Sequence, residues 1–114
     1  MYTYKAIVTS VYDGDTVTCD IDLGLNMWTK GQKIRLLGVD TPELRGDERE
    51  AGLKARDFVR GELMPNGEQS EIVLVTYKDR KGKYGRWLGE IFYGGGLTSL
   101  NVALADMGYV DVAE

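Results

Sequence analysis

A tight-turn signal between two strand-like stretches constrains the fold of this chain more than any other feature. Asp13-Gly14-Asp15 is typical of a hairpin turn. After it, residues 16–23 alternate between apolar and polar, as expected of a strand with one buried face. Residues 3–12 are rich in Tyr, Val, Ile and Thr and read as the partner strand. The two segments predict an antiparallel hairpin whose second strand buries Val17, Cys19, Ile21 and Leu23.

Three further strands are predicted downstream of this hairpin. Residues 33–39 read as the third strand, after a connecting loop or wide hairpin end at 24–32. Residues 71–77 form the most strongly strand-like segment of the chain, and a charged hairpin at 78–85 leads from it to a fifth strand at 86–93. The chain is therefore expected to contain five strands in two groups.

Two helical patterns interrupt or follow the strands. Asp47 and Glu50 have the spacing of a capping box, and helical periodicity of apolar residues follows them. A second helix is predicted over about 98–107, with Ser99 or Thr98 as its cap. The buried stripe of this second helix is expected to comprise Leu100, Ala103, Leu104 and Met107.

The order of these elements predicts the fold class. Three strands, a helix, two strands and a final helix form the plan of an OB-fold barrel. We therefore expect an α+β, mainly β fold: a five-stranded OB-fold barrel with a helix between strands 3 and 4 and a C-terminal helix. Residues 1–114 are expected to form one domain, because 114 residues match one ordinary domain and no internal repeat is visible. A barrel of this kind implies no function by itself.

The residue types that are absent exclude several kinds of chemistry. The chain has no histidine, which excludes His-dependent catalytic triads, histidine metal sites and histidine general bases. Its single cysteine, Cys19, allows no intrachain disulfide and is expected to be a small buried apolar residue. No run of 18 apolar residues is present, so no membrane span is expected. Because the N-terminus lacks the apolar core of a signal peptide, the chain as given is expected in the cytoplasm, unless a leader was removed beforehand.

The charges are unevenly distributed along the chain. The net charge is −4, whereas a nucleic-acid-binding protein is usually basic. Residues 78–86 nevertheless carry five basic residues and one acid, and residues 40–50 carry five acids and two arginines. A basic strip facing an acidic pocket suits a metal site that handles phosphate better than a uniform charge would.

Several ionisable residues lie where strands end or begin. Asp13, Asp15, Asp40 and Glu43 lie at predicted turns, where an acid can serve a purely local role by bonding its own backbone. A cluster of carboxylates without histidine would instead favour Ca²⁺ or Mg²⁺ over zinc.

Two arginines are also candidates for a site. Arg35 interrupts the apolar pattern of the third strand, and Arg86 opens the fifth. Each is either a solvated residue on the outer face or a group aimed at a pocket. The spacing alone leaves both alternatives open.

Three segments together resemble the signature blocks of the staphylococcal nuclease (thermonuclease) family. They are 11–17 with Asp-Gly-Asp-Thr, 35–43 with Arg-Leu-Leu-Gly-Val-Asp-Thr-Pro-Glu, and 83–88 with Lys-Tyr-Gly-Arg. They occur in the family's order, and the resemblance runs from about residue 4 to 112. One such motif would be weak evidence, but the series is very specific.

The resemblance implies a role for each matching residue. Asp15, Asp40 and the backbone carbonyl of Thr41 are implied ligands of one Ca²⁺. Arg35 and Arg86 are implied to clamp the phosphate, and Glu43 to position or deprotonate the attacking water. Three further positions have implied supporting roles. Asp13 would shape the metal surroundings, and Lys83 and Tyr84 would contact the substrate.

This inventory suits phosphodiester hydrolysis. Attack on phosphorus adds negative charge to oxygens that a cation and two guanidinium groups can stabilise. Arginine suits this role because its planar donors can bond two oxygens at once. We therefore expect a monomeric calcium-dependent nuclease that cuts DNA and also RNA and leaves 3′-phosphate ends. The alternatives are a non-catalytic OB-fold module that binds nucleic acid or protein, and an interaction domain with a vestigial site.

Overall fold

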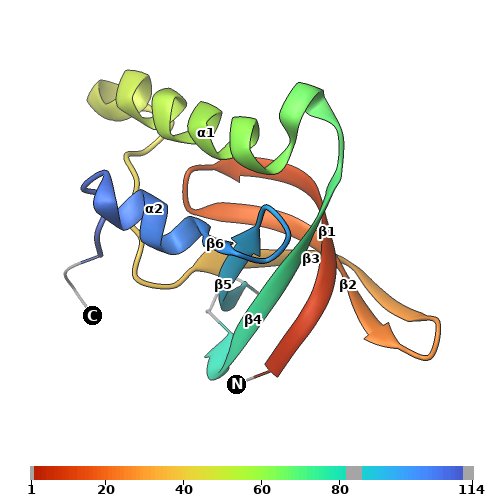
Figure 1. Cartoon of the computed structure of the whole chain (residues 1–114). Helices are drawn as coiled ribbons and strands as arrows, with labels where there is room; N and C mark the ends of the chain where they lie inside the picture. Colours follow the sequence, from red (N-terminus) through yellow and green to blue (C-terminus); the bar gives the residue numbers. More distant parts are fainter. Residues whose placement is uncertain (1, 82–85, 112–114) are drawn as a thin grey trace.

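The computed structural model describes residues 2–81 and 86–111, with side chains described for 2–77 and 86–111. Within these ranges it contains a barrel and two α-helices (Figure 1). Two short 3₁₀ turns, at Gly46–Glu48 and Pro65–Gly67, flank the first helix. The helices are α1 (Arg49–Leu63) and α2 (Leu100–Asp106), and the strands are β1 (Tyr2–Asp13), β2 (Thr16–Gly24), β3 (Met27–Leu36), β4 (Ser70–Lys81), β5 (Trp87–Tyr93) and β6 (Thr98–Ser99).

The strands form one sheet that closes on itself. Their order is β3-β2-β1-β4-β5-β6, and a further pairing between β3 and β5 closes the barrel. That closing pairing is parallel, whereas the other pairings are antiparallel. The expected five-stranded, mainly β OB-fold barrel is thus confirmed, with the short strand β6 added at the edge of β5.

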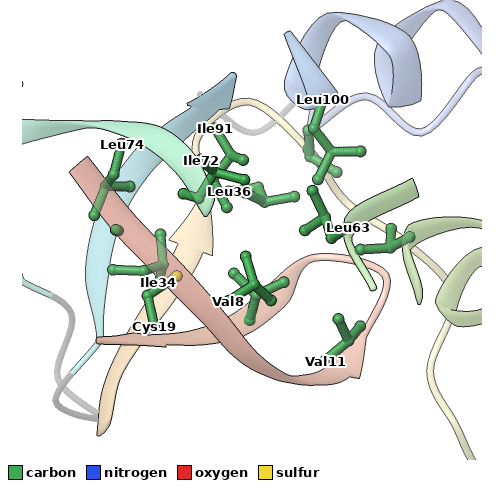
Figure 2. Close-up of a cluster of buried hydrophobic side chains, with 14 of the residues drawn as sticks. Val8, Val11, Cys19, Ile34, Leu36, Leu63, Ile72, Leu74, Ile91 and Leu100 are labelled. Atoms are coloured by element: carbon green, nitrogen blue, oxygen red, sulfur yellow. The ribbon is translucent and has the colours of Figure 1, made fainter. Parts of the chain in front are cut away.

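The core fills the barrel and continues beneath the helices. Inward-facing residues such as Val8, Cys19 and Ile34 are fully buried, as the alternation along the strands predicts (Figure 2). Helix α1 lies across one end of the barrel, where Leu63 joins the core beside Leu100 of α2 (Figures 1 and 2). The expectation that Cys19 is a buried apolar residue is confirmed.

The segment 24–32 was predicted as a connecting loop or a wide hairpin end, and the structure shows the end of a hairpin, although a tight one. Strand β3 begins at Met27, so β2 and β3 are joined by a two-residue turn at Leu25 and Asn26. Both residues have positive φ, 55° and 62°, as the tightest hairpin turn requires. Leucine is rarely found in this conformation, which explains why no tight turn was predicted at this position.

Of the two helix caps predicted from the sequence, only the one at α2 is found in the structure. The capping box predicted at Asp47 does not form, because a 3₁₀ turn precedes α1 and its N-cap, Glu48, makes no side-chain capping bond. At α2 the prediction of Ser99 as the cap is confirmed, since its hydroxyl accepts a bond of 3.1 Å from the Val102 N–H. Met107 lies beyond this helix and is half exposed, so it does not belong to the buried stripe.

The helices were also compared with the requirements for crossing a membrane. None of the helices in the described part of the chain combines the length and apolar character of a transmembrane span.

Candidate phosphodiesterase site

Asp15 lies at the centre of a hydrogen-bonded cluster where the β1–β2 turn enters β2. It is only 8% exposed, so its carboxylate needs partners. One oxygen accepts a bond of 3.3 Å from the Thr16 hydroxyl, and the other accepts one of 3.2 Å from the Thr41 N–H. The guanidinium of Arg35 lies 3.7 Å from the second oxygen. The cluster thus joins residues that precede β3 in the chain, lie on it and follow it.

Arg35 is held over this carboxylate by strand pairing and by backbone carbonyls. The register of β2 and β3 places Arg35 opposite Thr16. Its Nη1 donates to the carbonyl of Leu36 at 3.0 Å and also to that of Val39. With a side chain 20% exposed, Arg35 is therefore directed toward the cluster and is not a solvated residue of the outer face.

Arg86 reaches the same cluster from the other side. It immediately precedes β5, which pairs in parallel with β3 and so lies beside it. Its Nη1 donates to the Thr16 hydroxyl at 3.4 Å. Since Thr16 in turn donates to Asp15, the two arginines, which we call the arginine pair, converge on one buried carboxylate.

Sequence reasoning missed Thr16. Its hydroxyl connects Asp15 to Arg86, and its backbone pairs with Arg35. A threonine after an acid carries no distinctive pattern. The signal lay in the motif itself, because Thr16 is the last residue of the Asp-Gly-Asp-Thr segment.

Two glycines allow the turn, the helix and the Thr41 segment to approach one another closely. A Cβ on Gly14 would lie 2.7 Å from the Thr41 methyl and 2.9 Å from Ala55 of α1. A Cβ on Gly52 of α1 would lie 2.3 Å from the carbonyl oxygen of Glu43. Only glycine avoids these clashes, so the sequence of both elements is tied to the packing of the site.

Asp13 and Glu43 line one hollow beside the cluster. The hollow has a volume of about 240 Å³ and is also lined by Tyr12, Leu44 and Arg45. Burial, followed by the hydrogen bonding and charge of Asp15, raises the pKa of Asp13 to about 6. Glu43 is exposed, and its backbone N–H donates to the Glu48 carboxylate at 3.3 Å. The structure therefore brings these two predicted residues together at an open surface.

Asp40 is held less firmly than Asp15. Its backbone N–H donates to the Tyr109 carbonyl at 3.3 Å, next to a bridge between Val39 and Val110. Its side chain is exposed and makes no hydrogen bond or ion pair with any described residue. No cluster of three or more acidic or cysteine side chains with metal-binding geometry is found in residues 2–77 and 86–111.

The donor atoms near Asp15 are nevertheless of the type that Ca²⁺ prefers. They are carboxylate, hydroxyl and backbone oxygens, without nitrogen or thiolate ligands. The buried Thr41 hydroxyl oxygen has no hydrogen-bond partner in the described part of the chain, as expected beside a site for a polar group. In chemical type, Asp15, Asp40 and Thr41 fit this cation. Lys83 and Tyr84, the predicted substrate contacts, lie outside the described residues.

Comparison with known proteins identifies relatives along most of the chain. Residues 33–114 match the family model described as "Staphylococcal nuclease homologue". The match begins within β3 and so does not include Asp13 and Asp15.

Two curated relatives extend this comparison. An uncharacterized protein of Methanocaldococcus jannaschii, MJ1439, is 32% identical over 133 residues, covering 96% of this chain and 59% of its own length. The thermonuclease of Staphylococcus hyicus is 35% identical over 95 residues, covering 81% of this chain and 49% of its own. The chain thus spans about half the length of the curated relatives it matches. Because the family model matches most of the chain's residues, the chain belongs to the staphylococcal nuclease homologue family.

Proposed function

We propose that this chain is a calcium-dependent nuclease that hydrolyses phosphodiester bonds of DNA and RNA and leaves 3′-phosphate ends. The observation that carries the proposal is the convergence of the arginine pair on Asp15 and Thr16. One guanidinium group beside a buried carboxylate, and a second on the threonine next to it, offer a site for an anion close to a site for a cation. The family membership, and the relative named thermonuclease, support the same activity.

In this proposal each side chain has a defined task. Asp15, Asp40 and the Thr41 carbonyl hold Ca²⁺, which supplies positive charge to the phosphate when bound. Arg35 and Arg86 bond the phosphate oxygens as their negative charge increases. Glu43 faces the open hollow and takes the proton of the attacking water, since the chain has no histidine to do so. Asp13 shapes the metal surroundings, and Lys83 and Tyr84 contact the substrate. Residues 1–114 act as one domain and as a monomer.

Cleavage assays test this proposal directly. Single-stranded DNA is incubated with the protein in calcium and in a chelator, and with the Glu43→Ser and Arg86→Ala variants. We expect no cleavage in the chelator and a loss of about 10²-fold or more in each variant. Cleavage that ignores calcium, or that survives both substitutions, would contradict the mechanism.

The matched controls make the same two substitutions at an acid and an arginine outside the site. Glu68→Ser removes an exposed acid after α1, and Arg56→Ala removes an arginine whose ion pair is with its neighbour Asp57. Both controls should cleave like the unaltered protein. Binding of DNA without cleavage would favour the alternative of a non-catalytic OB-fold module.

A further inference from the structure

A second hollow lies at the open end of the barrel, away from α1. The β1–β2 turn, at one end of β2, packs against Ala55 of α1, whereas Leu23, near the other end of β2, lines the hollow. This hollow, which we call the mouth hollow, has a volume of about 170 Å³. Its wall consists of Tyr4, Ile21, Leu23, Thr29, Gln32, Thr76 and Trp87.

Hydrogen bonds fix the aromatic wall of the mouth hollow. The indole N–H of Trp87 donates to the Gln32 side-chain oxygen at 3.1 Å. The Gln32 amide nitrogen donates in turn to the Thr29 hydroxyl at 3.0 Å and to the Lys30 carbonyl at 3.2 Å. The ring plane is thus held before any ligand arrives, which lowers the entropic cost of binding.

The lining of the hollow also includes a second ring and polar atoms. Tyr4 and Thr76 line the hollow, and within the described part of the chain neither hydroxyl has a hydrogen-bond partner. A flat ligand in the hollow would therefore lie beside two aromatic rings and two hydroxyls that could bond its polar edge. Nucleobases have this combination of a flat ring and polar edges.

The mouth hollow lies on the same two strands as the arginine pair. Trp87 directly follows Arg86, and the parallel register pairs Ile34 with Trp87 and Arg35 with Leu88. Because side chains alternate along a strand, Trp87 and its partner Ile34 point into the barrel, whereas Arg35, the next residue on β3, points to the other face of the sheet, where Asp15 lies. The closest link between the two sites is therefore the step from Arg86 to Trp87 along the chain.

Positive charge continues along β3 from the arginine pair toward this rim. Lys33 lies two residues before Arg35, on the same face of the strand, and is exposed. Lys30 is exposed as well, and its carbonyl belongs to the Gln32 network. A polyanion bound at Arg35 could follow these lysines to the mouth hollow.

We propose that the mouth hollow binds one base of the nucleic-acid strand whose phosphate the arginine pair holds, a proposal that rests on the proposed function. The base stacks on Trp87, and the hydroxyls of Tyr4 and Thr76 bond its edge. The backbone crosses the rim between β3 and β5. Base stacking tolerates every sequence, so the hollow adds affinity for unpaired strands without selecting a particular base.

Fluorescence of Trp87 tests the proposal. The chain has two tryptophans, so Trp28→Phe leaves Trp87 as the only one, and Glu43→Ser is added because the proposed function expects it to slow cleavage about 10²-fold or more. The probes are an eight-nucleotide oligothymidine and an abasic oligomer of the same length, both in calcium. We expect the oligothymidine to quench Trp87 and to bind about 10-fold more tightly than the abasic oligomer, since stacking accounts for the difference.

Substitution of the aromatic wall provides the second arm. Trp87→Leu, followed by the anisotropy of a labelled oligomer, should bind oligothymidine about 10-fold more weakly while binding the abasic oligomer as before. Tyr4→Leu, which removes the other aromatic ring of the lining, should give the same selective loss of oligothymidine binding. If neither variant folds, as judged by circular dichroism, the comparison of the two oligomers in the unaltered hollow still decides the question.

The possible outcomes separate this inference from the nuclease proposal. Base-dependent quenching without any cleavage by the unaltered protein would support the mouth hollow and contradict the nuclease. Cleavage with an unchanged KM in Trp87→Leu would support the nuclease and overturn the mouth hollow. Quenching that depends only on protein concentration would assign the hollow to a second copy of the chain, and an apolar dye that binds without competition from the oligomer would assign it to an apolar ligand. Either result overturns the inference.

Discussion

The two halves of the proposed active site differ in how the fold holds them. Asp15, Thr16 and Arg35 belong to or adjoin paired strands, are buried or half-buried, and bond one another. Asp40 and Glu43 lie on an irregular segment after β3, and their carboxylates are exposed. The first half is suited to hold charged groups at fixed positions. The second half is suited to contact water and ions, and its placement depends on backbone packing and on hydrogen bonds donated by its backbone N–H groups.

The largest effect is expected from the strand-held half. Arg35→Ala should lower kcat/KM for single-stranded DNA by about 10²-fold or more, because it removes two planar donors from the phosphate. Arg35→Lys should restore little of this activity, since an ammonium group is a point charge and cannot bond two oxygens in one plane. A lysine variant with full activity would show that charge alone is sufficient at this position. The strand-held half would then need no fixed geometry, and the contrast with the exposed half would disappear.

The next effect tests the backbone packing that places Glu43. Gly52→Ala should lower the free energy of unfolding by about 1–3 kcal/mol, because the new methyl meets the Glu43 carbonyl at 2.3 Å. Gly61→Ala in the same helix meets nothing within 4 Å and should instead raise stability by about 0.5–1 kcal/mol. Urea denaturation measures both. If the two variants have equal stability, helix α1 does not position the Glu43 segment.

A smaller effect is expected at Thr16. Thr16→Val removes the hydroxyl that joins Asp15 to Arg86 and should cost about 1 kcal/mol of stability. Thr16→Ser keeps the hydroxyl and should restore most of both stability and cleavage. The same loss in both variants would trace the effect to the methyl group and to packing instead.

The smallest change in stability is expected in the exposed half. Asp40→Asn and Glu43→Gln should alter the free energy of unfolding by no more than about 0.5 kcal/mol, because neither carboxylate is buried. Asp40→Asn should nevertheless raise the calcium concentration required for half-maximal cleavage. A large loss of stability in either variant would show that this segment is more tightly integrated than its exposure indicates.

Much of the barrel could be predicted from alternation and turn signals. The first hairpin, the buried face of β2 from Val17 to Ile21 and the cap of α2 all follow from local patterns, whereas Leu23, predicted to be buried, is 49% exposed near the end of the strand. The β2–β3 turn could not be predicted, because Leu25 adopts a conformation that its side chain disfavours. The capping box at Asp47 was also predicted wrongly, because a 3₁₀ turn occupies Gly46–Glu48 and α1 begins only at Arg49.

The candidate site was predictable in its residue types but not in its connections. The motifs identified the acids and arginines, yet spacing alone could not decide whether Arg35 points to solvent or to a pocket. That choice depends on the register of β2 against β3 and on the carbonyls of Leu36 and Val39. The link through Thr16 likewise requires β5 to lie beside β3, a contact between residues about 50 positions apart.

The parallel pairing of β3 with β5 has a consequence for the order in which parts of the protein fold. It spans only Ile34–Leu36 against Trp87–Gly89, and it joins segments that are distant in the chain. Such distant contacts form late in folding, because a long loop must first be closed. Arg86 reaches Thr16 only once β3 and β5 have paired. A chain with its hairpins formed and the β3–β5 pairing still open would have most of its secondary structure but not the proposed phosphate site, so the proposed activity would report on barrel closure itself.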